Sequence, residues 1–338
     1  MNKCIFIICW FGKLPAYFDI WLQTAKYNSK FDFLILTDDS YKNTLPDNVF
    51  FRKYSLPQFR ERAKEVLKSQ VSIKRAYRVC DFRPMYGLIF SEYITKYDFW
   101  GYCDLDLIFG NIDSFVTDKM LCDNDAIFNA GHFTLIRNIA RTNNLFKQDG
   151  SVFSYKIVIK NDAIFAFDEF TGIQRIAHKT GLKAIFGIPY VDADAKYKQL
   201  TSRTAKVNPQ NQAFYWEKGN LYRVILYKGK ILYQNIAYIH MQKREIKETE
   251  ISAESFWITP DGYYNKYYLG KPTERDILVM NPFDGVQEQR KMARGYKIRK
   301  IKEIFFRNPF QIYVRINQAM HGINAKDSVI DDDEWCVY

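Results

Sequence analysis

The sequence predicts an α/β protein built on a mainly parallel sheet, and two observations support that fold class. Residues 4–9 (CIFIIC) are β-branched and aromatic, as in a strand covered on both faces. A turn, a helical pattern and a second apolar run follow within about 35 residues, which is the length of one βαβ unit with a right-handed crossover. The 338 residues suffice for one large domain with appendages or for two domains.

The remaining elements follow from the same patterns in chain order. A turn containing Gly12 and Pro15 precedes the first helix, and Gly110 ends the last apolar run of this region. No repeat or low-complexity linker occurs before about residue 285, so we expect one α/β domain over 1–245 and a C-terminal extension over 246–338. We expect helices over 16–27, 59–79 and 85–95, and strands over 31–37 and 98–109.

Composition and charge exclude several classes of protein. With 47% hydrophobic, 17% aromatic and 26% charged residues, the chain is neither disordered nor fibrous. Its formal net charge of +11 indicates an anionic partner, which could be a nucleic acid, a phosphorylated small molecule or an anionic membrane face.

The cysteines and the apolar segments indicate a cytoplasmic protein. None of the 6 cysteines forms a C-x-x-C pair, which is typical of reduced thiols in the cytosol. The apolar N-terminal run could belong to a signal peptide, but no small-residue cleavage site follows it, so a first buried strand is the better interpretation. No segment approaches the roughly 20 apolar residues that span a bilayer.

The segment 286–318 is strongly basic and is predicted to form an amphipathic helix. Its apolar residues recur at spacings of three and four between the Lys and Arg residues. Such a helix can lie on an anionic bilayer surface, which would make the protein peripheral at the inner face of the cell membrane. Alternatively, Ile298, Ile301 and Phe305 dock on the catalytic domain. Residues 331–334 (DDDE) are expected to be a solvated acidic tail.

The segment that carries chemistry ends in two carboxylates, Asp104 and Asp106. They close the apolar strand predicted over 98–109, and residues two apart in a regular strand point to the same face. Two neighbouring buried carboxylates are costly unless a cation or hydrogen bonds offset their charge. Mn²⁺ or Mg²⁺ bridging these oxygens to a diphosphate would do so, at the strand ends where ligands collect in open α/β sheets. A solvated pair at a strand end is the alternative.

At these residues the sequence resembles glycosyltransferases of the GT-A fold, and more closely a bacterial family found among polysaccharide-biosynthesis proteins. The resemblance spans about residues 4–245 and implies a Rossmann-like, mixed, mainly parallel sheet flanked by helices. That family tends to have Lys where this chain has Arg78 and Arg83, which keeps the charge but changes the phosphate-binding geometry. The matching stretches are FGKLPAYF (11–18), FLILTDD (33–39), CDFRPMYGLIF (80–90), YDFWGYCDLDLIFGNI (97–112), GHFTLIRN (131–138), FDEF (167–170) and YIHMQKR (238–244).

The resemblance implies a metal and diphosphate site. A late His often supplies a third metal ligand in GT-A enzymes, so His240 is expected to join Asp104 and Asp106 around Mn²⁺ or Mg²⁺. Lys243 and Arg244 follow His240 and are expected to hold the diphosphate of a nucleotide sugar, most simply a UDP-sugar. A lone His in an apolar strand can instead be structural.

The resemblance also implies a nucleotide site over the first strand ends. Asp81 would bind a ribose hydroxyl or a base N–H and Arg83 a phosphate, although Asp81 ahead of Pro84 could simply cap a helix. Lys13 could equally be a solvated turn residue. The residues expected around the nucleotide are Phe11, Gly12, Lys13, Asp38, Asp81, Arg83 and Asp104.

The acceptor-side carboxylate is expected to be Asp168, with Glu169 as the second choice; both follow the aromatic run 164–167. In inverting GT-A enzymes such a carboxylate is the general base on the acceptor hydroxyl, and in a retaining enzyme it could assist on the sugar's β-face. An ordinary acidic pair at a helix N-terminus is the alternative. His132 could contact the donor sugar or the acceptor, or be a buried structural residue.

These features together predict a metal-dependent glycosyltransferase that moves a hexose from a nucleotide sugar to a surface glycan. The acceptor is expected to be lipid-linked, on a polyprenyl diphosphate, or a growing polysaccharide. A metal-dependent nucleotidyl- or phosphotransferase is the alternative enzyme, although the chain lacks a G-x-x-x-x-G-K-[ST] loop. A basic nucleic-acid-binding protein would also explain the charge, but no recognisable nucleic-acid module is present.

Overall fold

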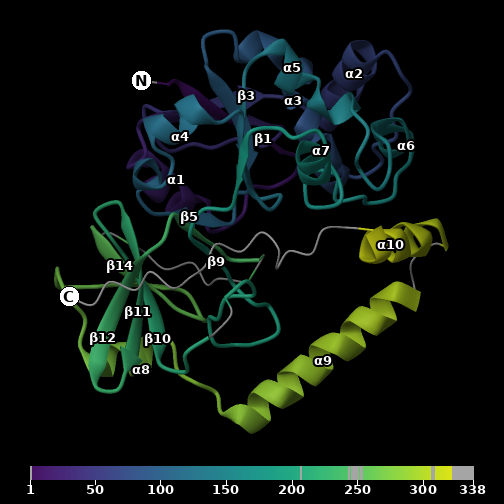
Figure 1. Ribbon diagram of the computed structural model, residues 1–338. Coiled ribbons are helices and arrows are strands. Elements are labelled where there is room, and N and C mark those ends of the chain that lie inside the picture. The colour runs from purple at the N-terminus through teal and green to yellow at the C-terminus, as the bar shows by residue number, and fades with distance from the viewer. Residues whose placement is uncertain are drawn as a thin grey trace.

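The computed structural model describes residues 2–205, 208–242, 244, 251, 254–305 and 309–321. Its larger body is a seven-stranded sheet in the order β3-β2-β1-β4-β7-β6-β8 with helices packed around it (Figure 1). The strands are β1 (Cys4–Trp10), β2 (Phe31–Thr37), β3 (Val49–Lys53), β4 (Phe99–Cys103), β6 (Ala126–Asn129), β7 (Phe133–Arg137) and β8 (Ala184–Phe186).

The pairing within this sheet is mixed and mainly parallel, which confirms the predicted α/β class. β1 pairs in parallel with both β2 and β4, β2 with β3, and β6 with β8. β7 runs antiparallel between β4 and β6. The carboxyl ends of β1, β2 and β4 therefore lie at one edge of the sheet, where ligand sites form in such folds.

Helices cover both faces of the sheet, and two of them are shorter than predicted. Helix α2 (Leu56–Leu67) starts in a capping box between Ser55 and Gln58 and ends at Lys68, whose left-handed backbone (φ 48°) stops the helix well before residue 79. The helix predicted over 85–95 is reduced to α3 (Tyr86–Ile89) after a 3₁₀ segment over Ala76–Met85. The others are α1 (Phe18–Lys26), α4 (Asp118–Asp123), α5 (Ala140–Asn143), α6 (Tyr155–Lys160) and α7 (Ile173–Lys179).

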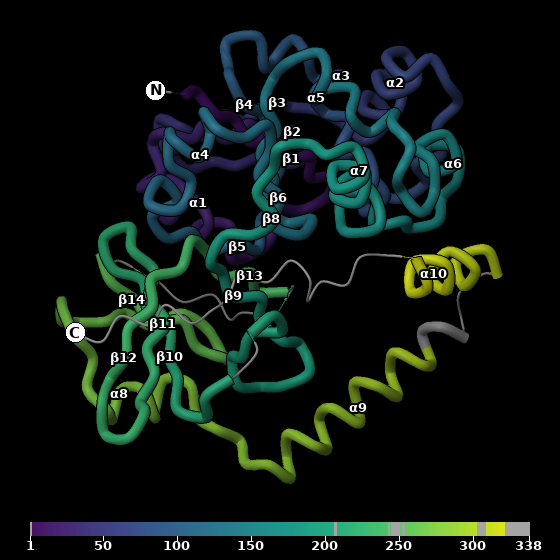
Figure 2. Tube along the Cα trace, viewed as in Figure 1, coloured from purple at the N-terminus to yellow at the C-terminus, as the bar shows by residue number. Residues whose placement is uncertain are grey.

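The single strand predicted over 98–109 is wrong, because the chain changes sheets within it. β4 ends at Cys103, and β5 (Leu107–Phe109) pairs instead with β13 (Tyr238–His240). β13 also pairs in parallel with β9 (Tyr190–Asp192), and Figure 2 shows this small sheet between the two larger ones. The break places Asp104 and Asp106 in the connection between β4 and β5.

A second, antiparallel sheet crosses the expected domain boundary at residue 245. Its order is β12-β11-β10-β14-β15, so strands from both sides of residue 245 pair with each other, and a cut there would divide the sheet. Helix α8 (Glu274–Met280) packs on it through the buried Ile277. The strands are β10 (Gln212–Glu217), β11 (Asn220–Tyr227), β12 (Lys230–Asn235), β14 (Ser255–Ile258) and β15 (Tyr263–Asn265).

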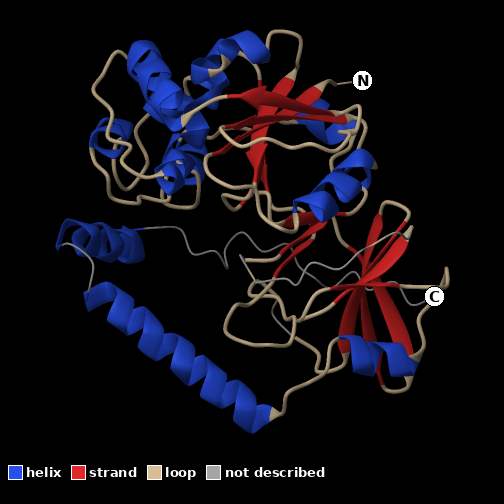
Figure 3. Cartoon of the chain, turned by 180° about the vertical axis from the view of Figure 1, so that it is seen from behind, coloured by secondary structure: helices blue, strands red, loops and turns tan. Residues whose placement is uncertain are grey.

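The basic C-terminal segment forms two helices rather than the one predicted over 286–318. α9 (Val286–Phe305) and α10 (Pro309–His321) point in different directions, and α9 lies at the periphery of the molecule in both opposite views (Figures 1 and 3). Ile298 and Ile301 are exposed, so they do not dock on the larger body as the alternative held. Every helix in the described part of the chain is too short or too polar to cross a bilayer. Residues 331–334 lie outside that part.

Candidate metal and substrate site

The backbone groups of Asp104 and Asp106, in the β4–β5 connection, are hydrogen-bonded to three neighbouring segments. The N–H of Asp104 donates to the carbonyl of His132 (3.1 Å), and the carbonyl of Asp104 accepts from the indole of Trp21 (3.2 Å). The carbonyl of Asp106 accepts from the N–H of Met241 (2.9 Å). These bonds tie the connection to β7, α1 and β13, so both carboxylates are supported by rigid elements.

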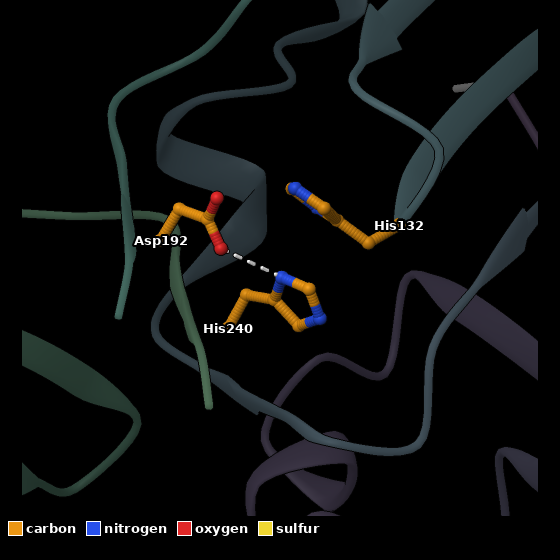
Figure 4. Close-up of side chains that lie close together, drawn as sticks. All are labelled: His132, Asp192 and His240. Atoms are coloured by element: carbon orange, nitrogen blue, oxygen red, sulfur yellow. Dashed lines mark hydrogen bonds and ion pairs between the residues drawn. The ribbon is translucent and has the colours of Figure 1, made fainter. Parts of the chain in front are cut away.

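His240 joins these aspartates from the end of β13. Its Nε2 lies 3.3 Å from Asp106 Oδ1 and 3.7 Å from Asp104 Oδ2. Its Nδ1 lies 2.9 Å from Asp192 Oδ1, the contact drawn in Figure 4. Asp192 therefore orients the ring so that Nε2 faces the carboxylate pair, as a second carboxylate commonly does for a metal-ligating His.

The pKa values of His240 and Asp192 are shifted far from their usual range by their neighbours in this cluster. Burial disfavours the protonated His240 ring, but the carboxylates of Asp106 and Asp192 outweigh that effect and raise its pKa to about 10. Burial would raise the pKa of Asp192, yet the hydrogen bond with His240 and the nearby imidazoles lower it to about 2. The carboxylates thus create a negative potential that attracts a cation.

His132 lies beside this cluster, with its ring centroid 4.3 Å from that of His240. Its Nδ1 is 3.0 Å from the hydroxyl of Tyr238, whereas its buried Nε2 has no hydrogen-bond partner among the described residues. Burial and the charge of His240 lower the pKa of His132 to about 3, so its ring is neutral. Because Asn129 Nδ2 donates to the Tyr238 hydroxyl, that hydroxyl donates to His132 Nδ1, and the neutral ring carries its hydrogen on Nε2, which can donate to a ligand.

Two groups of described residues could hold a metal ion, and they share His240. Asp104, Asp106 and His240 form one, and His132, Asp192 and His240 the other, each with ligand atoms within 4.8 Å of one another. The first group presents two carboxylate oxygens and one nitrogen, a set that suits Mn²⁺ and is compatible with Mg²⁺. It also leaves His240 Nδ1 on Asp192, so it keeps the hydrogen bond that the second group would lose.

Arg83 links the metal-side carboxylates to the expected acceptor side. Its guanidinium bonds Asp104, Asp168 (3.1 Å to Oδ2) and the carbonyl of Gly131 (2.8 Å). We expected Arg83 to bind a phosphate, but in this structure two carboxylates already engage it. Its position between Asp104 and Asp168 partly neutralises charges that would otherwise repel each other.

Asp168 and Glu169 lie next to one another, and the structure distinguishes them. Asp168 is 3% exposed and bound by Arg83, whereas Glu169 is partly exposed. Burial raises the pKa of Asp168 against the opposing charge of Arg83, and burial together with Asp104 raises the pKa of Glu169. A Cβ at Gly131 would lie 2.6 Å from Glu169 Cγ, so the absence of a side chain there makes room for this pair.

The turn after β1 is pinned to the end of β2. The N–H of Gly12, whose φ of 102° favours glycine, donates to Asp38 Oδ1 (2.7 Å). The ring of Phe11 packs edge-on against Phe59, and the Lys13 side chain is exposed. These residues therefore build the turn at the same sheet edge as Asp104, and Asp38 uses one carboxylate oxygen to hold it.

Asp81 was expected to bind a ribose hydroxyl or a base N–H, and in the structure its carboxylate is engaged by protein groups instead. It is buried, pairs with Arg78 (2.6 Å), and accepts from the backbone N–H groups of Phe165 (3.0 Å) and Phe167 (2.7 Å). Those bonds shape the segment that leads into Asp168. Asp81 is thus a structural support for the segment that carries Asp168 and Glu169.

Arg244 is also placed differently from the expectation that it holds the diphosphate. Its guanidinium donates to the carbonyls of Asp194 (2.8 Å), Tyr197 (2.9 Å) and Lys198 (2.9 Å). It therefore anchors the 194–198 loop after β9. Lys243 lies outside the described residues.

Asp192 is the site residue that sequence analysis missed. It ends the three-residue strand β9, and the parallel pairing of β9 with β13 brings it beside His240. A signal was present, because Asp192-Ala193-Asp194 repeats the spacing by which Asp104 and Asp106 were recognised at a strand end.

A protein-family model matches residues 6–267 of the chain. The chain belongs to this family. It is described as a family of unknown function, DUF6625, and the match covers all three sheets and every residue of the cluster described above. A search of the curated proteins found no match.

Proposed function

We propose that this protein is a metal-dependent glycosyltransferase, which transfers a hexose from a nucleotide sugar, most simply a UDP-sugar, to an acceptor hydroxyl. One observation carries the proposal: Asp104, Asp106 and His240 gather beyond the carboxyl end of β4, beside the turn after β1. Paired carboxylates at that edge of a mainly parallel sheet suit a cation bound to a diphosphate. The resemblance to GT-A enzymes points to the same reaction.

These three residues would hold Mn²⁺ or Mg²⁺, with Asp192 fixing the tautomer and orientation of His240. When bound, such an ion offsets the negative charge that develops on the leaving nucleoside diphosphate. The neutral His132 is suited to donate a hydrogen bond from its buried Nε2 to an oxygen of the donor sugar or of the acceptor.

On the acceptor side, Glu169 is the better candidate for the general base and Asp168 for the residue that positions it. Glu169 is partly exposed and can meet an incoming hydroxyl, while Asp168 is held by Arg83. A carboxylate with a raised pKa accepts a proton more readily near neutral pH, which suits this role.

We further propose that the acceptor is lipid-linked, on a polyprenyl diphosphate, or is a growing surface polysaccharide. The protein would then work as a cytoplasmic, peripheral enzyme at the inner face of the cell membrane. The net charge of +11 and the exposed basic helix α9 support an anionic surface as partner.

The first prediction tests the metal and donor site directly. The protein is incubated with a panel of nucleotide sugars, with Mn²⁺ or with EDTA, and release of nucleoside diphosphate is measured. We expect one donor to react in Mn²⁺ only, and Asp106→Asn to lower that rate on the order of 100-fold or more, because the variant loses a charged metal ligand.

Asp261→Asn is the matched control, since Asp261 is exposed on the loop before β15. It should turn over like the unmodified protein. A donor that reacts equally in EDTA, or an Asp106→Asn variant with full activity, would refute the proposed function.

A further inference from the structure

Helix α10 buries two glutamines and exposes several apolar side chains, the opposite of an ordinary amphipathic surface helix. The face turned toward the larger body carries Gln311, Val314 and Gln318, all buried. Gln311 exchanges two hydrogen bonds with the backbone of Ile164 (2.8 and 3.1 Å), and Gln318 donates to the carbonyl of Phe165. Polar side chains therefore dock this helix on the segment that leads to Asp168.

The opposite face of α10 is apolar and exposed. Tyr313 and Ile316 are each 53% exposed, Met320 is 69% exposed, and Phe310 lies one turn earlier at 40%. Tyr313, Ile316 and Met320 lie on the side opposite the buried glutamines, and Phe310 lies at its border. The rings of Phe310 and Tyr313 also contact Phe165 and Phe153 of the larger body, at centroid distances of 6.3 and 6.0 Å. An exposed apolar side on a helix that buries its glutamines is typical of a surface that contacts a further partner.

Helix α9 supplies the chemistry that identifies this partner. All of its residues over 286–302 are exposed or half-exposed, and the only acidic one among them is Glu288. Cations on exposed side chains gain little from folding but bind an anionic surface, where each contributes about 1 kcal/mol. The basic residues are Arg290, Lys291, Arg294, Lys297, Arg299, Lys300 and Lys302.

We propose that α9 and the exposed stripe Phe310–Tyr313–Ile316–Met320 of α10 form one docking surface for an anionic lipid bilayer. The stripe inserts among the lipid headgroups, and the α9 cations bind their negative charges. Because α10 is bonded to Ile164 and Phe165, docking brings the bilayer beside the segment that carries Asp168 and Glu169. This inference rests on the proposed function for a lipid-linked acceptor, although the lipid contact itself needs neither metal nor donor.

The test is sedimentation of the full chain with vesicles, without metal or nucleotide sugar. The vesicles contain phosphatidylcholine alone or mixed with phosphatidylglycerol. We expect binding only to the mixed vesicles. Arg294→Glu/Lys297→Glu should weaken it at least about 25-fold, since each cation contributes roughly fivefold. Ile316→Ser/Met320→Ser should weaken it about tenfold or more through lost apolar insertion.

Matched controls are Lys42→Glu/Lys230→Glu and Leu269→Ser/Val279→Ser, which change exposed residues of the same kinds elsewhere. These control variants should bind the mixed vesicles with an affinity close to that of the unmodified chain. Because all these side chains are exposed, thermal unfolding should confirm that each variant folds.

Several outcomes would overturn this inference. They are absence of binding to mixed vesicles, a stripe variant that binds like the unmodified chain, or light scattering that shows the stripe joining two copies of the chain instead. Asp106→Asn should bind vesicles normally. If the chain binds vesicles but shows no donor-dependent activity, the lipid-docking surface is supported and the proposed glycosyltransferase function is refuted.

Discussion

The acidic site and the C-terminal helices use charge in opposite ways. In the site, Asp106, Asp192 and His240 are buried and each lies against another charged or polar group. In α9, the cations extend into solvent, and the printed sequence places seven of them within thirteen residues, 290–302. Both regions are charged, but only the charges of the site are surrounded by protein.

This difference indicates the size of the partner that each region binds. A buried charge is expensive without a counter-charge, so a buried cluster selects a small ion or group that fits among its atoms. Exposed charges cost little alone and act together on an extended surface of opposite sign. We therefore expect site variants to change chemistry and metal affinity, and α9 variants to change only surface binding.

The largest effect is expected at Glu169, the proposed general base on the acceptor side. Glu169→Gln removes a charge at almost constant size and should lower kcat about 10²–10⁴-fold, because proton abstraction from the acceptor loses its base. KM for the donor should change little. Steady-state kinetics with varied donor and saturating acceptor measure both constants. Glu288→Gln on α9 is the same chemical change in the other region and should leave kcat unaltered.

Asp168→Asn completes this experiment. It loosens Arg83 and hence Asp104, so we expect it to raise KM for the donor along with lowering kcat. If Glu169→Gln keeps its kcat while Asp168→Asn loses it, Asp168 is the base instead.

A smaller effect is expected from the residue that orients His240. Asp192→Ala should weaken Mn²⁺ binding about 10–100-fold, as loss of a metal ligand's supporting carboxylate generally does, and Asp192→Asn should restore part of it. Isothermal titration with Mn²⁺ measures this. His132→Ala should bind Mn²⁺ normally, and a loss of affinity there would move the metal to the His132–Asp192–His240 group.

The smallest expected effect is the change of Mn²⁺ affinity with pH, which distinguishes the site from α9 without any mutation. Because the pKa of His240 is about 10 in the metal-free protein, its ring is protonated near neutral pH and Mn²⁺ must displace that proton. Affinity for Mn²⁺ should therefore rise with pH, by up to about tenfold per unit between roughly pH 6 and 8. Vesicle binding should stay constant there, since Lys and Arg remain charged. Metal affinity that does not change with pH would contradict the arrangement of His240.

Much of the fold could be predicted because its signals are local. The runs 4–9 and 31–37 are buried strands as expected, since apolar residues on both faces require cover. The break after Cys103 could not be predicted, because residues 98–109 read as one apolar run whichever sheet each part joins. Helix α2 ends at Lys68 rather than at residue 79 because a single left-handed residue, which has no sequence signature in a lysine, stops it.

The candidate site likewise has residues that the sequence could predict and residues whose contacts it could not. Asp104 and Asp106 were expected as a pair because they are close in sequence, and His240 was expected beside them through the resemblance. Arg244 was assigned because it follows His240, and Asp81 was assigned through the resemblance. In the structure Arg244 bonds the 194–198 loop and Asp81 bonds the backbone of residues 165 and 167. Their partners are distant in the chain, so no local pattern identifies them.

The amino-acid sequence alone determined the α/β class, the basic charge and the kinds of side chain able to hold a hard metal ion, because periodicity and composition are properties of short segments. Only the tertiary structure decided that Asp192 supports His240, that Arg83 lies between Asp104 and Asp168, and that α10 turns its apolar side outward. Each of these depends on which strands pair and which face of a helix is covered, and those choices are made through space between segments that the chain itself keeps far apart.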